Sequence, residues 1–128
     1  MSAAPKGRLR LPRARRIKQG RDFARARAEG RRLVQGCLIM NWTLLPPGSL
    51  SRVGVITMRK LGHAPARSRA RRLLREAFRL QRHCLRTPAD IVLVARHSIA
   101  GRTYSEVERD FLTALQRAGI LRASVGTG

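Results

Sequence analysis

The alternation of apolar and polar residues along the chain predicts three β-strands. The stretch CLIMNWTLL at 37–45 is apolar enough for a strand, and PPGS at 46–49 is typical of a turn. In RVGVITM at 52–58, successive residues alternate between two faces, as they do in a strand. The run DIVLVA at 90–95 is apolar without interruption, which indicates a strand that is covered on both faces.

A period of 3.6 residues predicts a long helix over residues 65–83. Pro65 suits its first turn, where a missing amide hydrogen costs no hydrogen bond. One side of this helix is mostly apolar, and it carries Ala70, Leu73, Leu74, Ala77, Phe78 and Gln81. The other side is a row of arginines, and it carries Arg71, Arg72, Arg75, Arg79 and Arg82.

Two shorter helices complete the set of predicted elements. One covers residues 21–29, and Gly30 is placed just past its end. The other begins at Thr103, which matches a capping box with Glu106, and ends at Gly119. The order of the elements predicts an α+β sandwich with one small mixed sheet and three helices. In it, the long helix joins the second and third predicted strands as a β-α-β unit.

Length and charge narrow the class of protein. At 128 residues the chain suits a single domain, and 43% of its residues are hydrophobic, so it can bury a core. The 28 basic and 7 acidic residues give a formal charge of +21, which predicts a polyanionic partner. We expect a basic, disordered arm at 1–16, a single α/β domain at 17–121 and a flexible tail at 122–128.

Several other classes of protein do not fit the sequence. Cys37 and Cys84 are too few and too far apart for a disulfide or metal framework, so we expect free thiols in a reducing cytoplasm. No apolar stretch approaches the roughly 20 residues of a membrane span, and the basic N-terminus lacks the apolar segment of a signal peptide. No carboxylate cluster or Ser–His or Cys–His arrangement predicts catalysis by the protein alone. No metal-ligand spacing is found among His63, His83 and His97.

The stretch RKLGHAPARSRARRLLR at 59–75 is the candidate binding site. A strand ends before it and a helix begins within it, so free amide hydrogens and the positive end of the helix dipole meet there. The polar residues at this junction are Arg59, Lys60, Arg67, Ser68 and Arg69. An ordinary solvated helix face mixes both signs of charge, whereas residues 59–86 hold ten basic residues and one acidic residue. We interpret the segment as an anion-binding surface, with nucleic acid as the anion.

The segment RKLGHAPARSRARRLLREAF resembles the signature of the protein subunit of bacterial ribonuclease P. The resemblance continues in RIKQGRDFARARAEG near the start, DIVLVAR at 90–96 and RAGIL at 117–121, and covers about residues 15–121. It implies a left-handed β-α-β crossover, contrary to the usual rule, in a fold similar to the second domain of ribosomal protein S5.

The same resemblance implies a function. The protein would bind a catalytic RNA subunit and the 5′ leader of precursor tRNA, with no obligate protein partner. The RNA subunit, with magnesium held mainly by RNA and substrate, would hydrolyse the leader from the tRNA. The implied contacts to the RNA subunit are Arg59, Lys60, Arg67, Ser68, Arg69, Arg71, Arg72, Arg75 and Arg79. A cleft between the sheet and the first helix would hold the leader, and its implied residues are Phe23, Arg27, Asn41, Trp42 and Lys60.

The sequence departs from the family pattern at several positions. The usual Gly-Asn pair is Gly62-His63, and the usual Arg-Asn-Arg contains Ser68 in its centre. Two positions that are often aromatic in the family are occupied here by Arg27 and Asn41.

Two aromatic residues and the function itself each have a second interpretation. Phe23 either stacks on a leader base or packs in the core, and Trp42 is either a core residue or the edge of the cleft. Composition alone also fits a non-catalytic ribosomal or nucleoid-type nucleic-acid-binding protein. Cleavage of precursor tRNA on addition of the RNA subunit distinguishes the two functions.

Overall fold

Four strands and three helices make up the computed structural model of the chain, which describes residues 16–17 and 20–122. For Asp22, Ala26, Arg27 and Glu29 it describes the backbone alone. The helices are α1 (Gly20–Glu29), α2 (Ala64–Gln81) and α3 (Tyr104–Ala118). The strands are β1 (Arg31–Gln35), β2 (Leu38–Leu44), β3 (Arg52–Ile56) and β4 (Ala89–Ala95). Over these residues, every helix is too short or too polar to cross a bilayer.

The mixed sheet predicted from the sequence is present, with the strand order β1-β2-β4-β3. The strands β2 and β4 pair antiparallel, with Trp42 opposite Ile91, and β3 and β4 pair parallel, with Val53 opposite the same Ile91. Parallel neighbours require a crossover, and α2 provides it. The predicted β-α-β unit is thus confirmed, while its left-handed sense stays an expectation from the resemblance.

The strand β1 is an element that the hydrophobic pattern does not reveal. It forms a hairpin with β2 through a turn at Gly36 and Cys37, and Gly36 has a φ of +52°. The backbone amide of Cys37 donates a hydrogen bond of 2.9 Å to Oδ2 of Asp110 on α3. A Cβ atom at Gly36 would lie 2.1 Å from the same oxygen, so this turn requires glycine both for its φ angle and for its closeness to α3.

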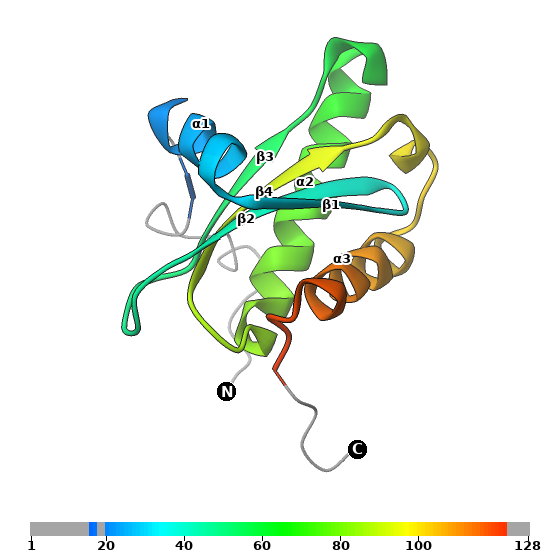
Figure 1. Cartoon of the computed structure of the whole chain (residues 1–128). Helices are drawn as coiled ribbons and strands as arrows, with labels where there is room; N and C mark the ends of the chain where they lie inside the picture. The colour runs from blue at the N-terminus through cyan, green and yellow to red at the C-terminus, as the bar shows by residue number, and fades with distance from the viewer. Residues whose placement is uncertain (1–15, 18–19, 123–128) are drawn as a thin grey trace, which may run out of the picture.

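The helices lie on both faces of the sheet (Figure 1). On one face, α2 and α3 pack on each other and on the strands, and the main core forms between them. On the other face, α1 covers part of the sheet, and a smaller apolar cluster forms beneath it. The buried members of this smaller cluster are Ile17, Val92 and Val94, with Phe23, Ile39 and Ile56 packed against them.

The first and the last described residues are held to the domain by backbone contacts. Arg16 pairs in a parallel bridge with Val53, and the amide of Ile17 donates a 2.8 Å hydrogen bond to the carbonyl of Val53. At the other end, the amide of Arg122 donates to the carbonyl of Cys84. Arg16 and Arg122 therefore belong to the domain, whose bounds were predicted as 17–121. The remainder of the predicted arm and tail lies outside the described residues.

The helix boundaries follow the local sequence signals. Thr103 and Glu106 form the predicted capping box, and Gly119 ends α3 in the left-handed conformation, with a φ of +77°. Pro65 lies in the first turn of α2, as predicted. The helix stops at Gln81, two residues before the predicted end, because the chain continues as a single 3-10 turn.

Candidate nucleic-acid interface

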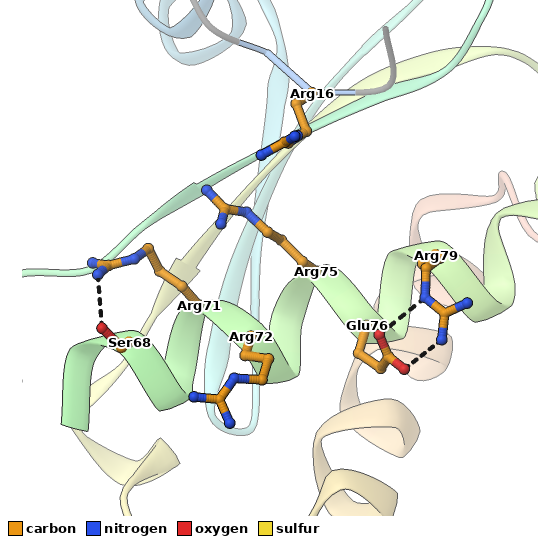
Figure 2. Close-up of a pocket in the computed structure, with 7 residues that line it drawn as sticks. All are labelled: Arg16, Ser68, Arg71, Arg72, Arg75, Glu76 and Arg79. Carbon is orange, nitrogen blue, oxygen red and sulfur yellow. Dashed lines mark hydrogen bonds and ion pairs between the residues drawn. The ribbon is translucent and has the colours of Figure 1, made fainter. Parts of the chain in front are cut away.

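A groove lined almost entirely by arginines runs between α2 and the segment at Arg16. Its volume is about 520 Å³. Arg16 reaches it because the bridge to Val53 holds the N-terminal segment beside β3, and Figure 2 shows Arg16 and Arg75 pointing toward each other. We call this site the arginine groove, and its lining residues are Arg16, Ser68, Arg71, Arg72, Arg75, Glu76 and Arg79.

The two ends of the arginine groove differ in charge. At one end, burial lowers the pKa of Arg75 below its usual value, and the neighbouring positive charges of Arg16 and Arg71 lower it further. At the other end, Nε of Arg79 donates a 3.0 Å hydrogen bond to Glu76, and a second bond joins Nη2 to the same carboxylate. This pairing raises the pKa of Arg79. An anion is therefore attracted most strongly to the end where Arg16, Arg71 and Arg75 converge.

The predicted outer face of α2 is less exposed than its sequence suggests. Arg72 is exposed, but Arg71, Arg75 and Arg79 are half-buried. Arg71 donates hydrogen bonds to Thr57 at 2.9 Å and to Ser68 at 3.2 Å, so its guanidinium is held toward β3. These contacts order the arginines before any partner is bound, which lowers the entropy cost of binding.

Two of the predicted arginines at the start of α2 donate hydrogen bonds to backbone carbonyls. Arg67 donates to the carbonyl of Gly62 at 3.0 Å, and Arg69 donates to the carbonyl of Arg102 at 2.7 Å. Arg59 is exposed on the 3-10 turn that precedes the helix. The residues from Arg59 to Arg69 thus extend the cationic surface beyond the arginine groove.

A second groove lies on the opposite face of the sheet, next to α1. It consists of two hollows of about 570 and 240 Å³ that share Ile39, Met58 and Val94. The larger hollow is also lined by Ala24, Ala28, Arg32 and Asn41, and the smaller one by Lys60, Leu61, Ala95, Arg96 and His97. We call the two hollows together the sheet groove; they match the predicted cleft between the sheet and the first helix.

The structure distributes the predicted leader residues over different sites. Asn41 and Lys60 line the sheet groove. Trp42 points to the other face of the sheet, where it is 6% exposed within the main core. A side chain buried there has no surface to offer a nucleotide, so the prediction of Trp42 as a leader contact is wrong and its interpretation as a core residue is confirmed. Arg27 is part of α1, but its side chain lies outside the described residues.

Phe23 packs against the sheet rather than lining the groove. Its ring lies over Gly54, where an added Cβ atom would be 2.4 Å from Cε1 of Phe23. The side chain is half-buried and belongs to the smaller apolar cluster. Of the two interpretations of Phe23, its packing supports the structural one, since the ring fixes the position of α1 and so the width of the sheet groove.

An ion pair also fixes α1 to the sheet. Asp90 on β4 is buried and accepts hydrogen bonds from Nε of Arg52 at 2.9 Å and from Nη2 at 2.6 Å. A guanidinium nitrogen of Arg25 on α1 approaches the same carboxylate at 3.7 Å. This fork-like geometry is the strong form of an Arg–carboxylate pair, and it links α1 to the edge of the sheet through one buried acid.

Several groove residues were not identified from the sequence, among them Arg16, Arg32 and Met58. Arg16 was assigned to the disordered arm, Arg32 lies in the strand that the pattern missed, and Met58 was taken only as a strand residue. Only tertiary pairing brings Arg16 and Arg32 to the grooves. For Met58 a signal existed, because an apolar residue directly before a basic turn is a candidate for exposure; it is 54% exposed.

Across residues 16–17 and 20–122, no three His, Cys, Asp or Glu side chains gather closely enough to hold a metal ion. Burial raises the pKa of Cys37 to about 12, and its hydrogen bond with Asp110 adds to the effect. The thiol of Cys37 is therefore a neutral core group at physiological pH.

The fold and the two cationic grooves together define a class, the small basic α+β domains that bind a polyanion such as RNA. The family model described as Ribonuclease P matches residues 11–119, and the chain belongs to this family. The comparisons give no support to the ribosomal or nucleoid-type alternative.

Curated relatives and solved structures agree with the family. A ribonuclease P protein component from Roseiflexus sp. (strain RS-1) is 37% identical over 117 residues, which cover 89% of this chain and 93% of the relative. One from Gluconacetobacter diazotrophicus is 31% identical over 109 residues, covering 84% and 94%. The RNase P protein from Thermotoga maritima superposes with a TM-score of 0.70 at 27% identity, covering 80% of this chain and 96% of that one. The one from Staphylococcus aureus, at 22% identity, shares the fold with a TM-score of 0.73, covering 84% and 98%.

Proposed function

We propose that this protein assists a catalytic RNA subunit in the removal of the 5′ leader from precursor tRNA, as the protein component of ribonuclease P. The observation that carries the proposal is the arginine groove, found in a chain whose residues 11–119 match the ribonuclease P family. The RNA subunit performs the hydrolysis, and the protein supplies binding and orientation.

The RNA subunit binds to the α2 face. Its phosphates are attracted to the end of the arginine groove where Arg16, Arg71 and Arg75 meet. These positive charges repel one another in the free protein, and a bound phosphate relieves that repulsion. Exposed Arg72 extends the contact, together with the arginines around the start of α2, which are Arg59, Arg67 and Arg69. Guanidinium groups suit this task, since they match phosphate oxygens with two parallel donors.

The leader binds to the sheet groove on the other face. A single strand needs a channel that takes bases and carries cations for its phosphates. The sheet groove has apolar walls between Arg32 at one end and Lys60 at the other. The two grooves lie on opposite faces of the sheet, so the protein binds both RNAs at once without competition between them.

Magnesium is held mainly by the RNA subunit and the substrate. The acidic residues support this, because the five whose side chains are described are all engaged within the protein: Glu76 with Arg79, Asp90 with Arg52, Glu106 with Thr103, Glu108 with Gln81, and Asp110 with the amide of Cys37. Within the part of the chain that the structure describes, no three His, Cys, Asp or Glu side chains gather, so these residues do not fit a protein-bound magnesium site. The free thiols of Cys37 and Cys84 suit the reducing cytoplasm, where we place the protein, and no obligate protein partner is required.

Reconstitution tests the proposal. Cleavage of a precursor tRNA by the RNA subunit of the same organism is measured with and without the protein, across a magnesium series. We expect a large gain in rate at low magnesium that fades as ionic strength rises, because screening replaces the fixed cations of a +21 protein. Absence of any gain at low magnesium would contradict the function, whereas a gain that is constant across the series would contradict only its electrostatic cause.

A further inference from the structure

Glu76 is the one acid among the described residues that line the arginine groove. The others in this lining are five arginines and Ser68. The helix α2 carries no second acid along its 18 residues. A carboxylate in this place repels phosphate, so it opposes the attraction that the arginines supply. The groove therefore contains a group that the binding of RNA does not by itself require.

The carboxylate of Glu76 occupies the guanidinium of Arg79. Nε of Arg79 donates to one of its oxygens at 3.0 Å, and Nη2 donates to the other, which is the two-bonded geometry of a strong Arg–carboxylate contact. Figure 2 shows this pair at the end of the groove away from Ser68. The side chain of Arg79 is 14% exposed, whereas that of Glu76 is 41% exposed. Because the acid is the more exposed partner, a phosphate that approaches this end meets the carboxylate first.

A second carboxylate adds negative charge at this end of the groove. Glu108 on α3 accepts hydrogen bonds from the hydroxyl of Tyr104 at 3.0 Å and from Gln81 at 2.6 Å. Burial raises the pKa of Tyr104, and the hydrogen bond with Glu108 and the negative charges of Glu108 and Glu76 raise it further. Both carboxylates therefore lie close enough to act on one hydroxyl, and Glu76 is supported by Glu108 in repelling an anion.

Stabilisation of α2 is a weak reason for an acid at position 76. A partly exposed ion pair between residues three apart on a helix contributes little to stability. A phosphate contact at Arg79 would strengthen the binding of any RNA, since each such contact adds to affinity. A groove without this contact has an advantage when it must distinguish between RNAs, because a repulsive group weakens the wrong partner.

We propose that Glu76 makes the arginine groove selective among RNAs. It keeps the guanidinium of Arg79 engaged and repels phosphate, so the groove attracts anions only over its section at Arg16, Arg71 and Arg75. An RNA that places its phosphates against that section binds, whereas an RNA whose backbone continues along α2 toward Glu76 is repelled. This inference rests on the proposed function and concerns which RNA the arginine groove accepts.

The substitution Glu76→Gln tests the proposal, because it removes the repulsion and frees Arg79 for a phosphate. The assay is equilibrium binding, over a salt series, of the RNA subunit and of an unrelated folded RNA of equal length. One added phosphate contact steepens the slope of log affinity against log salt by roughly 0.7–0.9. We expect this change with the unrelated RNA, together with a gain in affinity of at least about threefold near roughly 50 mM salt. The affinity for the RNA subunit should change by less than about twofold.

Two further variants separate the freed guanidinium from a general change of charge. Glu106→Gln removes one negative charge outside the groove, and glutamine can keep the capping box, so this control should leave the discrimination between the two RNAs unchanged. The double variant Glu76→Gln with Arg79→Gln has the net charge of the unaltered protein but no freed guanidinium, so it should regain the original discrimination. If Glu76→Gln does not fold, Glu76→Ala takes its place, since it frees Arg79 in the same way and favours the helix.

Three outcomes would overturn the inference. They are a Glu76→Gln variant that discriminates between the two RNAs as well as the unaltered protein, a Glu106→Gln variant that loses discrimination equally, and a double variant that does not regain it. Failure of the proposed function is recognised separately, because the unaltered protein would then bind the RNA subunit and the unrelated RNA alike.

Discussion

The charge cluster in the arginine groove predicts that Arg75→Gln stabilises the free protein and weakens its RNA complex. Arg75 sits between Arg16 and Arg71, and these positive charges together with burial lower its pKa. A like-charge pair on a helix surface costs about 0.2–0.5 kcal/mol. Relief from two such neighbours therefore amounts to about 0.4–1 kcal/mol, and the melting temperature should rise by roughly 1–5 °C.

Binding of the RNA subunit should change in the opposite direction. Loss of one phosphate contact lowers the slope of log affinity against log salt by roughly 0.7–0.9. The gap in affinity between Arg75→Gln and the unaltered protein should therefore narrow about threefold between roughly 50 and 200 mM salt. Equilibrium binding over a salt series and thermal melting of the free protein measure both effects.

The control for this experiment is Arg109→Gln, which removes the same charge from an exposed position on α3 outside the groove. It should leave the salt slope unchanged. An Arg75→Gln variant with an unchanged slope and unchanged affinity would show that the arginine groove does not hold phosphate. A lower melting temperature for Arg75→Gln would refute the claim that repulsion between the arginines of the groove destabilises the free protein.

Three further results are expected. Arg67→Ala and Arg69→Ala should each weaken assembly with the RNA subunit in a salt-dependent manner while the fold persists, as binding and circular dichroism can check. Phe23→Ala should lower stability by about 1–3 kcal/mol and also lower affinity for precursor tRNA, because the ring holds α1 in place; unchanged melting would contradict this. The thiol of Cys37, with its pKa raised to about 12, should resist alkylation at pH 9 in the native protein and react in denaturant.

The elements with strong local signals could be predicted from the sequence alone. The 3.6-residue period of apolar residues predicts the helix α2, and an unbroken apolar run predicts the strand β4. The ends of α3 follow from Thr103, Glu106 and Gly119, because capping depends on residues within one turn of each other. These signals are local, and tertiary packing did not override them.

The strand β1 could not be predicted in the same way. It begins with Arg31 and Arg32, lies at the edge of the sheet, and is only five residues long, so it shows little alternation. What holds it is pairing with β2 and the contact between Asp110 and the turn, both of which join distant parts of the chain. The glycine at position 36 between two short runs was the available signal for a hairpin.

The residues of the arginine groove were predicted more completely than those of the sheet groove. Alternation correctly puts Asn41 and Trp42 on opposite faces, but the face that becomes the core depends on the pairing of β2 with β4 and on which helices cover it. The arginine groove likewise needs Arg16, which reaches α2 only through a bridge to β3. Such placements depend on tertiary contacts, which no local pattern encodes.

The backbone bond from Ile17 to Val53 has a practical consequence for anyone who shortens this protein. A sheet edge with free amide and carbonyl groups recruits strands from other molecules and leads to aggregation. The β1 edge is partly blocked, since Arg117 donates a 2.8 Å bond to the carbonyl of Val34. The β3 edge relies on the backbone at Arg16 and Ile17. A recombinant version that starts after Ile17 would expose β3 to intermolecular strand addition, so a purification tag belongs before Arg16.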